Sequence, residues 1–222
     1  MKVALLLSGQ FRNGKECYQS IYDNLLKHYD VDVFIAYMYE EPELSFDELS
    51  ELYKPKYFVY HKYDDSLLEK FNLTNNFLHY TESTPSSLCK MWYSLDMVNK
   101  IKQEYERDNN FKYDVVIKCR FDIELLEKVE IKLPENQIYI PIGWDHMDGV
   151  NDIFAYGDSE SMDYYSSAFY SLDGFINEGR FIHPEMLLKA HLMKGNMMIL
   201  RNSFKMSLRG MKIHEQEYKM KL

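Results

Sequence analysis

The feature that most constrains this chain is the alternation of strand and helix patterns over its first 62 residues. Residues 3–7 form a continuous apolar run that ends at Ser8 and Gly9, as in a strand buried on both faces. A helical pattern follows, and then strand patterns at residues 31–36 and 57–60 with a short helical pattern between them. Strands that alternate with helices predict a parallel sheet covered on both faces. The opening therefore predicts a nucleotide-binding α/β half.

Later patterns extend this sheet. An apolar stripe at helical spacing runs from Leu88 to Tyr105, after a helix-start signal at residues 83–87. A central strand is predicted at residues 113–120. Beyond it the alternation loosens, and we expect further elements in short pieces. These are strands at 138–140, 153–156, 197–200 and 204–208, and helices at 162–176 and 184–193. The prediction is a single α/β domain over residues 1–222, with a mostly parallel central sheet flanked by helices.

The amino-acid composition excludes some classes of protein and of binding partner. The chain has 222 residues, 46% of them hydrophobic, which is ordinary for one sizeable core and excludes a disordered chain. Its 26 basic and 35 acidic residues give a formal charge of −9. A broad basic face is therefore absent, and nucleic acid is not expected as a partner.

The cysteines and the first residues of the chain indicate the cellular compartment in which we expect the protein. Cys17, Cys89 and Cys119 are far apart, odd in number and without metal-ligand spacing, so we expect reduced thiols in a cytoplasmic protein. The apolar run after Met1 stops at Ser8, far short of a membrane span, and no cleavage site follows it. We expect no transmembrane segment.

The end of the predicted central strand carries Arg120, Phe121 and Asp122. Ligands bind outside the carboxyl ends of strands in open α/β sheets. A carboxylate there supplies a hard oxygen for Mg²⁺ or Mn²⁺, and a guanidinium supplies paired hydrogen bonds to phosphate. The alternative is a surface Arg–Asp ion pair.

The first turn offers Ser8, Gly9, Gln10 and Arg12. Small residues after a buried strand let backbone N–H groups approach a ligand, and Arg12 can meet its charge. Neither a dinucleotide-binding glycine motif nor a P-loop motif is present. The alternative is a plain turn before a helix that starts at Asn13.

Carboxylates dominate the second half. Residues 145–163 hold six acids and no Lys or Arg, and Asp152 differs from the other five because it opens an apolar strand pattern. Trp144 offers a face on which a sugar ring could stack. Glu185 follows His183 and Pro184 at a helix start, where it either acts as a general base or stabilises the helix dipole.

The last segment, residues 200–222, holds six basic residues against two acidic ones. It is either a solvated basic end or a source of positive charge beside a phosphate site, where His214 is a possible metal ligand. The remaining histidines have no partner spacing, and we expect them to have no chemical role: His28, His61, His79, His146 and His191.

These signals occur in a characteristic order: VALLLSGQFR at residues 3–12, KMWYSLDMVNKIKQEYE at 90–106, YDVVIKCRFDIEL at 113–125, NDIFAYG at 151–157 and HPEMLLKAHL at 183–192. The series resembles small GT-A-type glycosyltransferases of bacterial surface-polysaccharide clusters and of large DNA viruses that glycosylate their own capsids. The resemblance spans roughly residues 1–200. It implies a nucleotide-diphosphate sugar donor, a divalent metal (Mn²⁺ or Mg²⁺) and a glycan acceptor.

The resemblance also implies roles for particular residues. GT-A enzymes usually carry Asp-x-Asp at the end of a central strand, whereas this chain has only the second acid, Asp122. Asp122 would bind the metal and the diphosphate, and Arg120 a phosphate. The turn at residues 8–12 would contact the nucleotide, which makes residues 1–122 the donor half and 123–222 the acceptor-facing half.

On the acceptor side, the resemblance implies that Asp152 lies at the acceptor and that Glu185 is the helix-start base of inverting members. Glycosyl transfer passes through an oxocarbenium-like state, so the leaving diphosphate needs a metal or cations. Glu185 is our first choice of base and Asp152 our second, and inverting and retaining mechanisms both stay open. The alternatives are a non-catalytic nucleotide- or glycan-binding domain of the same fold and a nucleotidyltransferase, which would release pyrophosphate.

Overall fold

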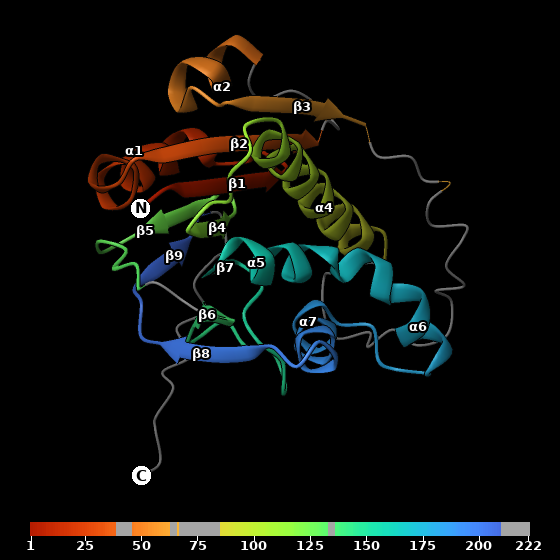
Figure 1. Cartoon of the computed structure of the whole chain (residues 1–222). Coiled ribbons are helices and arrows are strands. Elements are labelled where there is room, and N and C mark those ends of the chain that lie inside the picture. Colours follow the sequence, from red (N-terminus) through yellow and green to blue (C-terminus); the bar gives the residue numbers. More distant parts are fainter. Residues whose placement is uncertain (39–45, 63–65, 67–84, 133–135, 210–222) are drawn as a thin grey trace.

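The sheet at the centre of the molecule is visible in the computed structural model, which describes residues 1–38, 46–62, 66, 85–132 and 136–209 (Figure 1). The first part of the chain forms β1 (Val3–Gly9), α1 (Gly14–Asn24), η1 (Leu26–His28), β2 (Val31–Met38), α2 (Phe46–Tyr53), β3 (Tyr57–His61), α4 (Pro85–Asp108) and β4 (Val115–Cys119). The second part forms β5 (Ile123–Leu125), β6 (Gln137–Pro141), β7 (Phe154–Gly157), α5 (Ser159–Ser166), η2 (Ser167–Ser171), α6 (Leu172–Asn177), α7 (Pro184–Lys194), β8 (Met198–Asn202) and β9 (Met206–Leu208).

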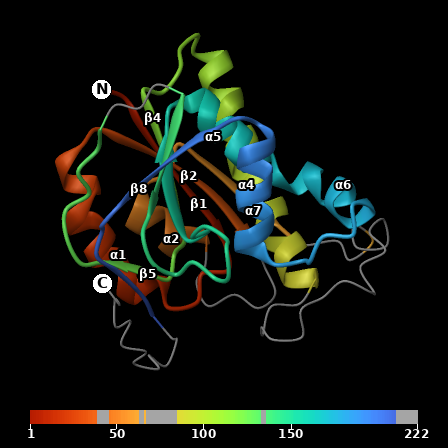
Figure 2. The same cartoon turned by 90° about the horizontal axis from the view of Figure 1, so that it is seen from below.

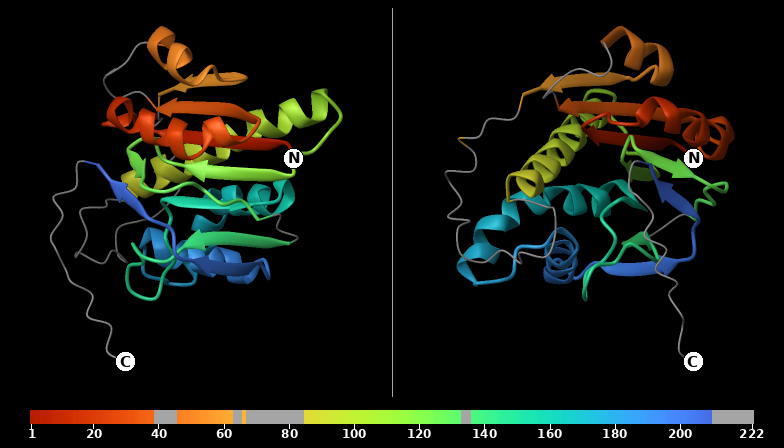
Figure 3. Two further views of the ribbon diagram at one scale, coloured as in Figure 1. Left: turned by 90° about the vertical axis from the view of Figure 1, so that its left-hand side faces the viewer. Right: turned by 180° about the vertical axis from the view of Figure 1, so that it is seen from behind.

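Seven strands form the main sheet in the order β3-β2-β1-β4-β7-β6-β8. Strands β1 to β4 pair in parallel, and β8 pairs in parallel with β6. Strand β7 runs antiparallel to both β4 and β6. The strands stack from β3 at the top to β8 at the bottom (Figures 1 and 3). The prediction of one α/β domain with a mostly parallel sheet is confirmed, because this sheet runs through both halves of the chain.

Both faces of the sheet are buried, as the apolar run of β1 predicts. Ala4 and Leu6 belong to a core cluster with Trp92 of α4, whereas Leu5 belongs to a second cluster with Ile21 of α1. Figure 2 shows α1 on one side of the sheet and α4, α5 and α7 on the other. Full burial of one such side chain contributes about 1.5–3 kcal/mol, so these runs fix the centre of the sheet.

The elements predicted in the first half are confirmed. The strand patterns correspond to β1, β2 and β3, and the apolar stripe lies in the 24-residue helix α4. The start signal at residues 83–87 agrees with the first residue of α4, Pro85. The three cysteines are buried and free.

The prediction of a single helix at residues 162–176 is wrong, because the segment divides into α5, the 3₁₀ helix η2 and α6. The Asp158 side chain accepts from the N–H of Ser161 and so begins α5 earlier than predicted. The Ser167 hydroxyl donates to the carbonyl of Tyr164 at the end of α5. Hydroxyl groups that bond the backbone in this way compete with regular helix, which explains the division.

The last strand also differs from its prediction. Strand β9 is shorter than the expected 204–208, and it pairs antiparallel with β5, a strand that the sequence did not indicate. This two-stranded sheet is tied to α1, since the Asn24 side chain donates to the carbonyl of Leu125 at 2.7 Å. In the described ranges, no helix is long and apolar enough to cross a membrane.

Candidate functional site

The candidate site lies at the edge of the sheet where the parallel strands end. Strands β1 and β4 finish there with Gly9 and Cys119. Because β7 is antiparallel, its first residue, Phe154, pairs with Cys119 at the same edge. The turn after β1, the segment after β4 and the segment before β7 therefore meet, although they come from distant parts of the sequence.

Asp122 lies at the centre of this edge and is 2% exposed. Arg120 donates from Nε to its Oδ1 at 2.8 Å and from Nη2 to its Oδ2 at 2.6 Å. Arg12 approaches the same Oδ2 with Nη1 at 3.4 Å. The paired contact is geometrically specific and strong, so Asp122 and the two arginines form one cluster, here called the arginine cluster.

The turn after β1 presents Arg12 to this cluster. Gly9 has a φ of +100°, which favours glycine, and Arg12 itself has a φ of +47°. Phe11 is buried, and its ring packs on Phe121 with centroids 5.4 Å apart. Gly14 leaves room for that ring, because a Cβ there would lie 2.6 Å from it. The Phe11–Phe121 contact thus fixes the turn against the segment that carries Asp122.

The other predicted residues of this turn sit beside Arg12. Ser8 is still part of β1 and pairs with Ala36 of β2. The Gln10 side chain accepts a hydrogen bond from Nε of Arg12 at 3.3 Å. The turn therefore combines the expected small residues with one exposed cation.

Lys118 is a residue that the sequence analysis did not single out. It lies within the apolar strand β4, is 3% exposed, and donates from Nζ to the backbone carbonyls of Asp152 and Ile153. Burial lowers the pKa of Lys118 to about 8, although the nearby Asp152 carboxylate opposes this shift. Its two hydrogen bonds fix the backbone at Asp152. A lone charge inside an apolar strand was the signal that could have identified it.

Glu185 opens α7 and faces His183. Its Oε2 lies 2.7 Å from Nδ1 of His183, and neither of these buried atoms has an aligned hydrogen-bond partner among the described residues. Burial raises the pKa of Glu185 to about 8, with a further contribution from Asp152 and an opposing one from Arg120. Burial also lowers the pKa of His183. The charges of Asp152 and Arg120 thus both act on Glu185, in opposite directions.

The loop of residues 142–150 also contacts Glu185. Its His146 lies with Nε2 3.8 Å from Oε1 of Glu185, so this histidine, expected to have no chemical role, lies near a candidate site residue. The Val150 N–H donates to the carbonyl of Glu185 at 3.1 Å. Gly149 is required for this approach, because a Cβ there would lie 2.5 Å from the backbone carbon of Glu185.

Asp145 and Asn151 hold this loop in shape. Arg201 of β8 donates from Nη2 to both oxygens of Asp145 at 2.8 Å and to the carbonyl of Pro141 at 2.7 Å. The Asn151 side chain is fully buried and donates to the carbonyl of Gly143 at 2.8 Å. These contacts hold the loop in a conformation in which Gly143, Trp144 and Met147 have positive φ angles.

The described part of the basic segment, residues 200–209, places its two arginines on other acids and not in the arginine cluster. Arg201 binds Asp145, and Arg209 binds Glu124 through two contacts of about 3 Å. His214 lies outside the described residues, as do Lys212, Lys219 and Lys221.

The carboxylates at this edge do not make an evident metal site. Within the part of the chain that the structure describes, no group of three or more His, Cys, Asp or Glu residues could hold a metal ion. Both oxygens of Asp122 are engaged by guanidinium groups. These donors do not fit a divalent cation, and the expected contribution of His214 stays a prediction.

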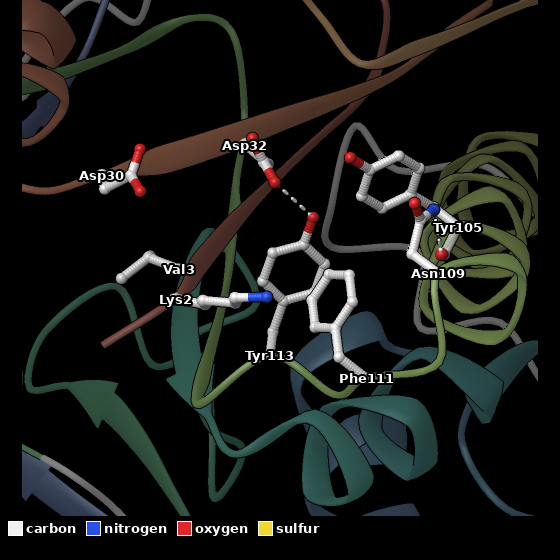
Figure 4. Close-up of a pocket in the computed structure, with 8 residues that line it drawn as sticks. All are labelled: Lys2, Val3, Asp30, Asp32, Tyr105, Asn109, Phe111 and Tyr113. Atoms are coloured by element: carbon white, nitrogen blue, oxygen red, sulfur yellow. Dashed lines mark hydrogen bonds between the residues drawn. The ribbon is translucent and has the colours of Figure 1, made fainter.

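A separate cavity of about 270 Å³ lies at the opposite edge, where β1 and β2 begin (Figure 4). Some of its lining groups contact one another. Tyr113 donates to Asp32 at 2.7 Å, and the Lys2 ammonium lies 3.8 Å from the centre of the Phe111 ring. None of the predicted site residues lines this cavity.

The site therefore has two sides. One carries the two guanidinium groups around Asp122, and the other carries Asp152, Glu185 and two histidines. Such an arrangement can bind an anion on the first side and accept a proton on the second. A comparison of this chain with family models and with curated proteins finds no match.

Proposed function

We propose that this protein is a glycosyltransferase with a GT-A-type fold that transfers a sugar from a nucleotide-diphosphate sugar to a glycan acceptor. The observation that carries the proposal is the meeting of opposite chemistries at one sheet edge. Arg12 and Arg120 can bind a diphosphate, and Glu185 beside them can act as a base. The carboxyl edge of a mostly parallel sheet is where such folds bind nucleotides.

On the donor side, the backbone turn at Gly9 and the arginine cluster would hold the nucleotide and its diphosphate. Guanidinium groups suit phosphate because their N–H donors match its oxygen atoms in pairs. The same cations would stabilise the charge that grows on the diphosphate as the sugar leaves.

On the acceptor side, Glu185 would accept the proton of the attacking hydroxyl group. The acceptor oxygen forms a bond to the anomeric carbon, and the bond from that carbon to the β-phosphate oxygen breaks. Its electron pair leaves with the nucleoside diphosphate, and the hydroxyl proton moves to the Glu185 carboxylate. A base on the acceptor side supports an inverting reaction, in which one displacement reverses the anomeric configuration.

The raised pKa of Glu185 supports this role. A carboxylate with a pKa of about 8 is a stronger base than an ordinary one and is half ionised at about that pH. His183, 2.7 Å from Oε2, would hold the carboxylate in place. Asp152, whose backbone Lys118 fixes, would line the acceptor site beside it.

The loop at residues 142–150 would contact the acceptor sugar. Its Trp144 is 37% exposed and Met147 is 64% exposed, and they belong to the same loop as Val150, whose N–H donates to the carbonyl of Glu185. An aromatic face next to a catalytic carboxylate is suited to stacking on a sugar ring. We expect the protein to work in the cytoplasm, where its buried free cysteines would stay reduced.

A donor screen tests the proposal. Binding at about a hundredfold excess over Kd stabilises the folded state by roughly 2.7 kcal/mol, or about 5–10 °C in Tm for a chain of this size. We expect such a shift with uridine or guanosine diphosphate sugars, together with slow donor consumption. A shift without consumption, even with glycan acceptors, would favour the non-catalytic binding domain. No shift with any sugar nucleotide would reject the proposal.

A further inference from the structure

The surroundings of Asp122 disagree with the divalent cation that a GT-A-type enzyme implies. A carboxylate binds Mg²⁺ or Mn²⁺ through oxygen lone pairs that point at the ion. In Asp122, Oδ1 accepts from Arg120, and Oδ2 accepts from Arg120 and also lies 3.4 Å from Arg12. A cation placed there would have to share the carboxylate with these donors and would meet the repulsion of two guanidinium groups.

Two other carboxylates of the site are already engaged. Asp145 is held by both of its oxygens in the contact with Arg201, and Glu185 lies against His183. No suitable group of three metal-binding side chains exists in the described ranges. The positive charge at this edge therefore comes from side chains.

We propose that Arg12 and Arg120, positioned by Asp122, bind the donor diphosphate and neutralise the leaving group without a divalent cation. The proposal rests on the proposed function and specifies how that site meets the charge of its substrate. Asp122 is then a positioning residue for two arginines.

Charge and geometry support this role. Two guanidinium groups and one carboxylate carry a net charge of 2 − 1 = +1, and the buried Lys118 lies near the end of β4, two residues before Arg120. Arg120 uses Nε and Nη2 on Asp122, so of the residues described none bonds its Nη1. That nitrogen remains free for a phosphate oxygen. A sugar nucleotide presents one negative charge on each of its two phosphates, so each of the two guanidinium groups can face one phosphate.

The two arginines differ in how firmly they are held. Arg120 has a 23% exposed side chain and two short contacts to Asp122. Arg12 has a 55% exposed side chain, and its contact of 3.4 Å is long. An exposed, long ion pair contributes little stability, so Arg12 can exchange Asp122 for a phosphate at small cost. Arg120 is thus the fixed cation and Arg12 the adjustable one.

Titration calorimetry with uridine diphosphate and guanosine diphosphate as probes tests this inference. For the wild-type protein we expect one of them to bind with the same Kd, within about twofold, in excess EDTA and in excess Mn²⁺. The Arg12→Gln variant changes an exposed side chain and should raise that Kd about tenfold. Arg120→Lys keeps a positive charge beside Asp122, loses the paired contact, and should also weaken binding. Arg180→Gln, which removes an exposed ion pair with Glu178, is the matched control and should change nothing.

The other outcomes separate this inference from the proposed function. Binding that requires Mn²⁺ would overturn the metal-free assignment and leave the glycosyltransferase proposal intact. Binding in EDTA that neither arginine variant weakens would overturn the role of the arginines. No binding of these two probes, or of any other nucleoside diphosphate, under any condition would overturn both.

Discussion

The two halves of the chain meet at one site but supply opposite charges to it. The first half contributes Arg12 and Arg120 from turns that follow long, buried parallel strands. The second half contributes Asp152 from the segment before a short antiparallel strand and Glu185 from the first turn of a helix. Under the proposed function, donor binding and proton transfer would therefore belong to separate pieces of the fold. Substitutions should therefore affect one function and leave the other unchanged.

The largest expected effect tests that separation directly. Glu185→Gln keeps the shape of the side chain and removes the base, so we expect kcat to fall about 10²–10⁴-fold. Donor affinity should stay within about twofold of the wild type, because the arginine cluster is intact. Kinetics and calorimetry on the same preparation measure both quantities.

Glu178→Gln is the matched control, because Glu178 is exposed and, among the residues that the structure describes, forms ion pairs only with Arg180 and Lys194. It should leave kcat unchanged. If Glu185→Gln retained full activity, Asp152 would become the base to examine.

The next effect is the dependence of activity on pH. Because the pKa of Glu185 is raised to about 8, its carboxylate becomes scarce as the pH falls below that value. We therefore expect kcat/KM to rise about tenfold per pH unit up to about pH 8 and then to level off. Donor affinity should not follow this curve between pH 6 and 8. A profile that is flat from about pH 5.5 to 8 would mean that Glu185 is not the base.

A smaller effect concerns the support of the acceptor side. Arg201→Gln removes the paired contact with Asp145 and the bond to the carbonyl of Pro141, so the loop at 142–150 loosens. We expect kcat/KM to fall about tenfold, since small misplacements of reacting groups reduce rates strongly. Calorimetry should show donor affinity unchanged. Reduced donor affinity would show that the two sides are not independent.

The smallest effect compares two glycines. Gly149→Ala places a Cβ 2.5 Å from the backbone of Glu185 and should cost about 1–3 kcal/mol of stability. Gly174→Ala meets open space in α6 and should instead stabilise the protein by about 0.5–1 kcal/mol. Thermal unfolding of both variants should thus give Tm shifts of opposite sign. Equal shifts would contradict the close contact between the loop and α7.

The parallel half was predictable because its strands are apolar runs and its helices have clear periodicity. Three such strands between helices leave few arrangements other than a covered parallel sheet. The short strand β5 was not predictable. Its three residues carry no pattern of their own, and it forms because β9 pairs with it from far along the chain.

The candidate residues were recognisable by type, but their relations were not. Arg120 and Asp122 stand together in the sequence, whereas the approach of Arg12 depends on the packing of Phe11 against Phe121. The neighbours of Glu185 depend on the folded loop, so His146 seemed isolated in the sequence. Lys118 was marked in the sequence only as a lone charge in an apolar strand, and its bonds to the carbonyl groups of Asp152 and Ile153 leave no sequence pattern.

The most direct test of the central claim is phosphorus NMR of donor turnover. Each sugar nucleotide that raises the Tm is incubated with the wild-type protein, with and without glycan acceptors, and the phosphorus products are identified. We predict that a nucleoside diphosphate accumulates, and that Glu185→Gln abolishes its formation although it binds the donor. Release of pyrophosphate would instead assign the site to nucleotidyl transfer, and an unchanged donor would contradict the claim that this edge of the sheet transfers sugars.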